Sequence, residues 1–424
     1  FKGVVNMKGS LIKQHRKFKN LTLEELASGI CSVSYLSKIE HDIINASDEI
    51  YRLLGERLNI KLTDINEEFD EKIHNALLEW NQAAQMRDFP LMDELYEDCK
   101  ASLEDNQNIE LVNLYQIIEV RHIMTKERKP IDEKKLKEIR TTYEDATNEY
   151  KFFFHKIVGV HHLFLGELPQ ALQHFNDTEK LMKKLPFDEG EVYLHLALTY
   201  SKSRAYVESN HYAFRALDLY KSTLHYSRMV DSYIIIAINY NSLGALQIAE
   251  DYLLKVLKIA KYHLPIHETR RIYHNLGSNY INQEKYEQAY YYLQKAYDIE
   301  TKETPFKAGT IYLLALASFH NGEKQLCEEY IQQGENIAVE NNYLKYKHKF
   351  YILKYMLNGK TLYEEFIKKL EDTIIPDFRR LNEYKDYKEF TEMLGNLFYE
   401  KRMYKKAAMY YKESNNYRDT QKKD

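Results

Sequence analysis

The sequence is poor in residues that break helices. Among its 424 residues there are only 14 glycines and 7 prolines. An all-β sandwich or barrel needs many tight turns, and those turns depend on glycine and proline. The low counts therefore argue against an all-β fold and favour helices joined by short connections.

Cysteines and long apolar runs are also scarce. The three cysteines, Cys31, Cys99 and Cys327, lie far apart and lack the paired spacing of a disulfide framework or a zinc site. Apolar runs such as YIIIAI at 233–238 are too short to span a bilayer, and FKGVVNMKGS has no apolar signal-peptide core. We therefore expect a cytoplasmic protein with no membrane partner.

The signatures of common catalytic sites are missing from the sequence. It contains no HExxH motif, paired CxxC motif, glycine-rich phosphate loop or nucleophile elbow. His161 and His162 are adjacent and so point to different sides of a helix, which does not suit a metal site. The sequence thus predicts a protein that is not an enzyme, with no catalytic residue, metal or cofactor.

The charge is distributed unevenly along the chain. The net charge is −4, yet residues 1–66 carry 10 Lys and Arg against 8 Asp and Glu. Six of those basic residues lie within the first 20 positions, where no acidic residue occurs. A positive field concentrated in this way favours a polyanionic partner. We therefore expect residues 1–66 and residues 67–424 to be separate domains with different partners.

Residues 10–58 show the start and stop signals of four short helices. SLIKQHRKF at 10–18 places Leu11 and Ile12 on one helical face, and Thr22 with Glu25 forms a capping box that starts a second helix. Gly29 then suits a left-handed turn. A third helix is expected from Ser32 to His41 and a fourth from Ser47 to Leu58.

These helices predict a helix-turn-helix whose recognition helix is SVSYLSKIEH, residues 32–41. Val33, Leu36 and Ile39 are spaced to pack against the preceding helix, while polar side chains project outward. A helix of this kind can read base edges in the major groove, and nearby cations can contact phosphates. The predicted DNA-binding residues are Ser32, Val33, Ser34, Tyr35, Ser37, Lys38, Lys13, Arg16 and Lys17.

The stretch LTLEELASGICSVSYLSKIE resembles the Cro/Xre type of helix-turn-helix. Its ICSxSxLSKIE portion is similar to the RRNPP-type peptide-pheromone regulators of Gram-positive bacteria. The turn is one residue shorter than in the wider Cro pattern, and Leu23 stands where many members have a glutamine that bonds a phosphate. The resemblance implies binding to double-stranded DNA by a homodimer or higher homo-oligomer.

From about residue 70 the sequence becomes self-similar. In HNLGSNYINQEKYEQAYYYLQKAYDIE, small and large residues follow the spacing of a tetratricopeptide repeat, with Gly277 and Leu293 among them. Copies recur about every 40 residues, including units with Gly159 and Phe175 and with Gly395 and Tyr411. The sequence therefore predicts an all-α chain, a helix-turn-helix followed by a right-handed superhelix of about 8–9 repeats.

The first helix of each repeat is expected to line the concave face, so its polar residues are candidates for ligand contact. Asn275, five residues before Tyr280, resembles the asparagine that clamps extended peptides in other tetratricopeptide domains. An amide can both donate to and accept from a peptide backbone. The predicted peptide-binding residues are Asn275, Arg271, His274, Ser278, Asn282, Asn241, Asn239, Lys202 and Arg121.

The resemblance implies a quorum-sensing transcriptional regulator that binds an imported peptide of about five to eight residues and changes its oligomeric state. A sporulation phosphorelay response regulator is a further implied partner. Two alternatives remain open at this point. One is an arbitrium-type phage receptor that controls lysis and lysogeny. The other is a repeat adaptor that binds a folded protein and has incidental DNA affinity.

Overall fold

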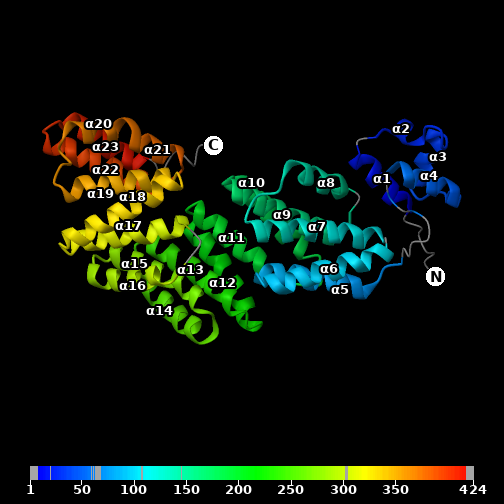
Figure 1. The fold of residues 1–424 in the computed structure, drawn as a ribbon, viewed down its shortest axis with the longest axis horizontal. Helices are drawn as coiled ribbons and strands as arrows, with labels where there is room; N and C mark the ends of the chain where they lie inside the picture. The colour runs from blue at the N-terminus through cyan, green and yellow to red at the C-terminus, as the bar shows by residue number, and fades with distance from the viewer. Residues whose placement is uncertain are drawn as a thin grey trace. The chain divides into compact units, whose positions relative to one another are not determined.

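The chain is built from helices. The computed structural model describes residues 8–19, 21–58, 60, 62, 68–106, 108–144, 146–300 and 304–416. These residues form helices and short connections, with no β-strand among them (Figure 1). The predicted all-α fold class is confirmed.

The N-terminal module contains four helices, α1 (Lys8–Phe18), α2 (Leu23–Ala27), α3 (Val33–Glu40) and α4 (Asp48–Leu58). The capping box is present as predicted, because the Thr22 hydroxyl accepts from the Glu25 N–H and the Glu25 carboxylate accepts from the Thr22 N–H. Gly29 has a φ of 72°, in the left-handed region. The helix boundaries therefore agree with the sequence prediction to within about two residues.

The core of this module joins all four helices. Leu11, Ile12, Leu26, Leu36, Ile39, Leu54 and Leu58 are buried in one cluster. One detail differs from the sequence prediction, because Val33 is 43% exposed and lies outside this cluster. Tyr51 of α4 is also buried in the core.

The remaining helices form hairpins of a first and a second helix. The first helices are α5 (Glu71–Met86), α7 (Ile109–Glu127), α9 (Asn148–Leu165), α11 (Gly190–Lys202), α13 (Tyr226–Ser242), α15 (Ile266–Asn282), α17 (Thr304–His320), α19 (Leu344–Leu357) and α22 (Tyr384–Glu400). The second helices are α6 (Phe89–Asp105), α8 (Glu133–Tyr143), α10 (Leu168–Met182), α12 (Tyr206–Ser222), α14 (Leu246–His263), α16 (Tyr286–Asp298), α18 (Lys324–Glu340) and α23 (Tyr404–Asn416).

After α19 the second helix is divided into α20 (Glu364–Lys369), the π-helical η1 (Leu370–Ile374) and α21 (Ile375–Arg380). Within the described residues, the chain order thus gives nine first helices, each followed by a second one. This number lies at the upper end of the predicted range. No helix in the described ranges is long and apolar enough to cross a membrane.

The repeat register predicted from small residues is visible in the packing of the hairpins. A Cβ added to Gly277 would lie 2.3 Å from the Leu293 side chain, and one added to Gly159 would lie 2.6 Å from the Phe175 ring. At Gly395 the Tyr411 ring lies 2.8 Å from such an atom. Glycine therefore allows the two helices of a hairpin to approach closely at the same repeat position.

By its internal packing the chain divides into two compact units, Phe1–Asn239 (unit 1) and Tyr240–Asp424 (unit 2). The four helices of the N-terminal module belong to unit 1. The domain boundary predicted between residues 66 and 67 lies outside the described residues, and it stays a prediction.

Candidate functional site

The recognition helix α3 presents its polar side chains to solvent. Ser32, Ser34 and Lys38 are exposed, and Ser37 and Tyr35 are half-buried, while Leu36 and Ile39 are fully buried. The Ser32 side chain caps the helix, because its oxygen accepts from the Tyr35 N–H at 3.2 Å. The exposed Val33 lies at the start of the same helix. The geometry therefore fits a helix that inserts its N-terminal half into a major groove.

Arg16 has a structural role within the module, and its part in phosphate contact stays a prediction. Its guanidinium forms a fork with Glu40, with Nε to Oε1 at 2.6 Å and NH2 to Oε2 at 2.8 Å. Its NH1 donates to the Leu21 carbonyl at 2.9 Å. Because the Glu40 side chain is almost fully buried, Arg16 is held as its counter-charge and ties α1 to α3.

The other two predicted phosphate contacts on α1, Lys13 and Lys17, are half-buried. Both line a cavity of about 310 Å³ between α1 and the helices α7 and α8 of unit 1. The Lys17 ammonium lies 3.9 Å from the Glu144 carboxylate. These two lysines thus lie at the junction between the N-terminal module and the first hairpins.

Five of the predicted peptide-binding residues lie on α15 in unit 2. Four of them, Arg271, Asn275, Ser278 and Asn282, are three or four positions apart and so share one face of the helix. Asn275 is half-buried, and its Nδ2 donates to the Arg271 carbonyl one turn earlier at 2.7 Å. This intrahelical bond holds the amide of Asn275 in one orientation.

Residues of neighbouring helices form hydrogen bonds with α15. The His274 ring nitrogen Nδ1 lies 3.0 Å from the Thr310 hydroxyl on α17. Burial, reinforced by Arg270, lowers the pKa of His274 to about 4, so its imidazole is neutral at pH 7. At the end of α15, Asn282 donates to the Asn241 amide oxygen at 2.8 Å. Helix α15 thus contacts α17 through His274 and α13 through Asn282.

Asn239 is not available to a ligand, which corrects its prediction as a peptide contact. It is fully buried in unit 1, and its Nδ2 donates to Ser209 Oγ at 2.7 Å and to Asn210 Oδ1 at 2.8 Å. Its oxygen accepts from Ser201 Oγ at 2.7 Å. Asn279 occupies the same repeat position in unit 2, where it is also fully buried and donates to the Leu246 carbonyl. Both asparagines tie a first helix to the preceding second helix.

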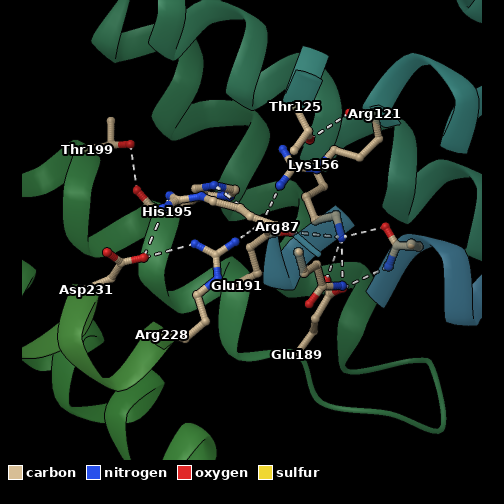
Figure 2. Close-up of polar contacts among 12 residues, drawn as sticks. Arg87, Arg121, Thr125, Lys156, Glu189, Glu191, His195, Thr199, Arg228 and Asp231 are labelled. Atoms are coloured by element: carbon tan, nitrogen blue, oxygen red, sulfur yellow. Dashed lines mark hydrogen bonds and ion pairs between the residues drawn. The ribbon is translucent and has the colours of Figure 1, made fainter. Parts of the chain in front are cut away.

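Arg121 lies in a buried cluster of charges in unit 1 that the sequence did not predict (Figure 2). At its centre is Glu191, whose carboxylate pairs with Arg121, with Lys156 at 3.4 Å and with Arg228 at 3.6 Å. The Glu191 and Lys156 residues have no exposed surface. These residues come from the first helices α7, α9, α11 and α13, so the cluster joins four successive hairpins.

Two further carboxylates, Glu189 and Asp231, and one further cation, Arg87, belong to the cluster. Glu189 accepts from Lys156 at 2.8 Å, and Asp231 pairs with Arg228 at 3.0 Å and with Arg87 at 3.7 Å. Four cations therefore face three carboxylates. The remaining predicted contact, Lys202, is exposed near the end of α11.

The charges in this cluster shift one another's protonation. Burial alone would raise the pKa of Glu191, but Arg121, Lys156, His195 and Arg228 outweigh it and lower that pKa. Burial lowers the pKa of His195 to about 3, so this histidine is neutral at pH 7. Among the described residues, the Arg121 Nε and the Arg228 Nε have no hydrogen-bond partner.

A second group of charges, built around the buried Asp386, lies in unit 2 between α19 and α22. Lys349 donates to Asp386 at 2.6 Å, and Lys345 pairs with Glu383 at 2.6 Å and with Asp386 at 3.1 Å. Burial would raise the pKa of Asp386, but the two lysines lower it. The sequence carries a signal for one residue of the unit 1 cluster, since Lys156 stands within the apolar stretch FFFHKIVGV. Which charges pair could not be read from it.

The N-terminal module matches the family model described as "Helix-turn-helix" over residues 12–65. Over nearly its whole length the chain is similar to the transcriptional activator NprA of Geobacillus stearothermophilus. The two are 28% identical over 404 residues, which cover 92% of this chain and 98% of NprA. The relative is named as a regulator of transcription, in agreement with the prediction that this chain is not an enzyme.

Solved structures share the fold. A Rap protein complexed with competence and sporulation factor matches with a TM-score of 0.69 and 20% identity, covering 82% of this chain and 98% of that one. The apo form of the quorum sensor NprR from B. thuringiensis matches with a TM-score of 0.67 and the same identity and coverage. NprR in complex with its cognate peptide NprX matches with a TM-score of 0.60 and 19% identity, covering 83% and 99%. The arrangement of tetratricopeptide-like helices is therefore confirmed.

Proposed function

We propose that this chain, which resembles the RRNPP-type peptide-pheromone regulators in both its helix-turn-helix and its helical repeats, is a transcriptional regulator controlled by a short peptide. The observation that carries the proposal is the exposed polar face of α3 on a buried apolar base. Similarity to a transcriptional activator across 92% of the chain supports it. The protein acts in the cytoplasm, where an imported peptide and the chromosome are both accessible.

The peptide, of about five to eight residues, lies along the polar face of the first helices. Asn275 holds its backbone through the amide group, with Arg271, Ser278 and Asn282 on the same face of α15. A peptide bound in this way prefers one arrangement of the repeats, and only such a preference can shift an equilibrium. The chain that binds DNA is a homodimer or higher homo-oligomer, because a single helix-turn-helix reads only one half-site.

Changes in oligomeric state on peptide binding belong to the same proposal. A small change in the separation of two recognition helices alters the fit to two half-sites and hence the affinity for DNA. The family resemblance extends the list of partners to a phosphorelay response regulator, bound by the peptide-free form. An arbitrium-type receptor of a phage would use the same two surfaces.

Replacing Asn275 with alanine is expected to weaken peptide binding about tenfold, because one or two hydrogen bonds to the peptide backbone are lost. Peptides retained by the purified protein are identified by mass spectrometry, synthesised, and measured against both proteins by calorimetry. The matched control is Asn341→Ala. Asn341 also donates to a carbonyl one turn earlier, Ile337 at 2.9 Å, but lies at the end of a second helix.

The control variant should bind the peptide as the parent does. If Asn275→Ala retains the full affinity, the peptide does not use the α15 face. If no peptide is retained and the α3 surface binds DNA regardless of sequence, the protein-adaptor function replaces this proposal.

A further inference from the structure

The N-terminal module is fastened to the repeats of unit 1 by an apolar contact. Ile109, the first residue of α7, is 6% exposed and belongs to the same core cluster as Leu11, Leu36 and Leu58. A repeat helix thus completes the core of the DNA-binding module. The two parts cannot rotate freely about each other without exposing this side chain.

Polar contacts fix the orientation of the same junction. The Gln14 amide on α1 donates to the Thr142 hydroxyl on α8 at 3.1 Å and to the Gln116 side chain on α7 at 3.4 Å. Thr142 is 6% exposed and Gln14 is half-buried, so the bond between them is partly buried. These part-buried hydrogen bonds favour one orientation, because a rotated module would lose the direct bonds from Gln14 to both repeat helices.

Helix α7 connects this junction to the buried charge cluster. It is continuous from Ile109 to Glu127, and its start is held by Asn108, whose side chain accepts from the Glu110 and Leu111 N–H groups. Arg121, twelve residues after Ile109, pairs with the buried Glu191. A helix rises about 1.5 Å per residue, so the two contacts lie roughly 18 Å apart on one rigid rod.

We propose that α7 couples the repeats of unit 1 to the recognition helix, and that Gln14 and Thr142 are the positioning residues that set the orientation of the DNA-binding module. This inference rests on the proposed function only in that the positioned module is the one proposed to bind DNA. A shift of α7 at the charge cluster moves Ile109 and Gln116, and with them the module that carries α3. The same coupling runs in reverse, from bound DNA to α7.

The orientation is tested on the full chain by electron–electron distance measurement. Nitroxide labels are placed at Glu56→Cys on α4 and Lys134→Cys on α8, both exposed, in a Cys31→Ser background; Cys99 and Cys327 are buried. The parent should show one narrow distance distribution, and Gln14→Leu combined with Thr142→Val should lose it. Thr142→Ser, which keeps the hydroxyl, should retain it.

The matched control is Thr141→Val, because the Thr141 hydroxyl donates to the Glu138 carbonyl of its own helix rather than to α1. It should leave the distance distribution unchanged. A broad distribution in the parent, or a narrow one in the Gln14→Leu, Thr142→Val protein, overturns the positioning role.

The coupling is tested by amide hydrogen exchange with a 30-base-pair duplex of random sequence at low salt. Binding should alter exchange in residues 117–127 of the parent, and this change should be lost in the Gln14→Leu, Thr142→Val protein at equal duplex occupancy. An identical response in both proteins contradicts the coupling. Failure of the parent to bind the duplex contradicts the proposed function instead, and the distance measurement still decides the positioning role.

Discussion

Replacing Glu191 with alanine is expected to destabilise the protein by about 3–5 kcal/mol, a large part of the 5–15 kcal/mol by which folded proteins are usually stable. The substitution leaves Arg121, Lys156 and Arg228 buried without their shared carboxylate. The loss should appear as a lower midpoint of urea unfolding followed by circular dichroism. Since the cluster lies in unit 1, the urea midpoint of that unit should fall more than the midpoint of unit 2.

The matched control for this experiment is Glu208→Ala. Glu208 is exposed on α12 in the same unit, so its loss should change the free energy of unfolding by less than about 0.5 kcal/mol. Adding Lys156→Met to Glu191→Ala should recover part of the stability, because one unpaired buried charge is removed. If Glu191→Ala unfolds at the same urea concentration as the parent, the charge cluster does not hold the hairpins together.

Changing Ser34 and Lys38 together to alanine is expected to weaken operator binding by ~30-fold or more, since each base-edge contact is worth about 1–3 kcal/mol. Both side chains are exposed on α3 and make no contribution to its buried base, so the module should stay folded. Fluorescence anisotropy at fixed salt measures the effect on a labelled duplex enriched from a random-sequence pool. Peptide affinity, measured by calorimetry, should not change.

A double variant at Lys221 and Ser222 provides the comparison for this loss. These two residues are exposed on α12, outside the helix-turn-helix, and their replacement by alanine removes the same chemical groups. This variant should bind the duplex as the parent does. Equal affinity in the Ser34, Lys38 variant would show that α3 is not the reading helix.

The parts of the fold that the sequence predicted depend on local pattern. The capping box at Thr22 and Glu25 and the left-handed Gly29 are set by residues within one turn of each other. The repeat register was also readable, because close helix approach requires a small residue opposite a large one, as at Gly277 and Leu293. Local signals of this kind keep their meaning whatever the rest of the chain does.

The charge cluster could not be predicted because its contacts are distant in sequence. Arg121 and Glu191 are 70 residues apart, and neither position shows which partner it meets. Asn239 and Asn275 illustrate the same limit for the site. Both are asparagines on first helices, yet Asn239 is fully buried among Ser201, Ser209 and Asn210, whereas Asn275 is half-buried. Repeat position, not residue type, separates the structural amide from the candidate ligand contact.

The central claim is that one chain reads DNA and adjusts this reading to a bound peptide. The most direct test is the affinity of the parent protein for its enriched duplex at one salt concentration, measured before and after its retained peptide is removed. We expect the two dissociation constants to differ by about 5- to 150-fold, the usual range of coupling between two sites. Equal constants, with peptide binding verified in the same samples, would contradict the claim.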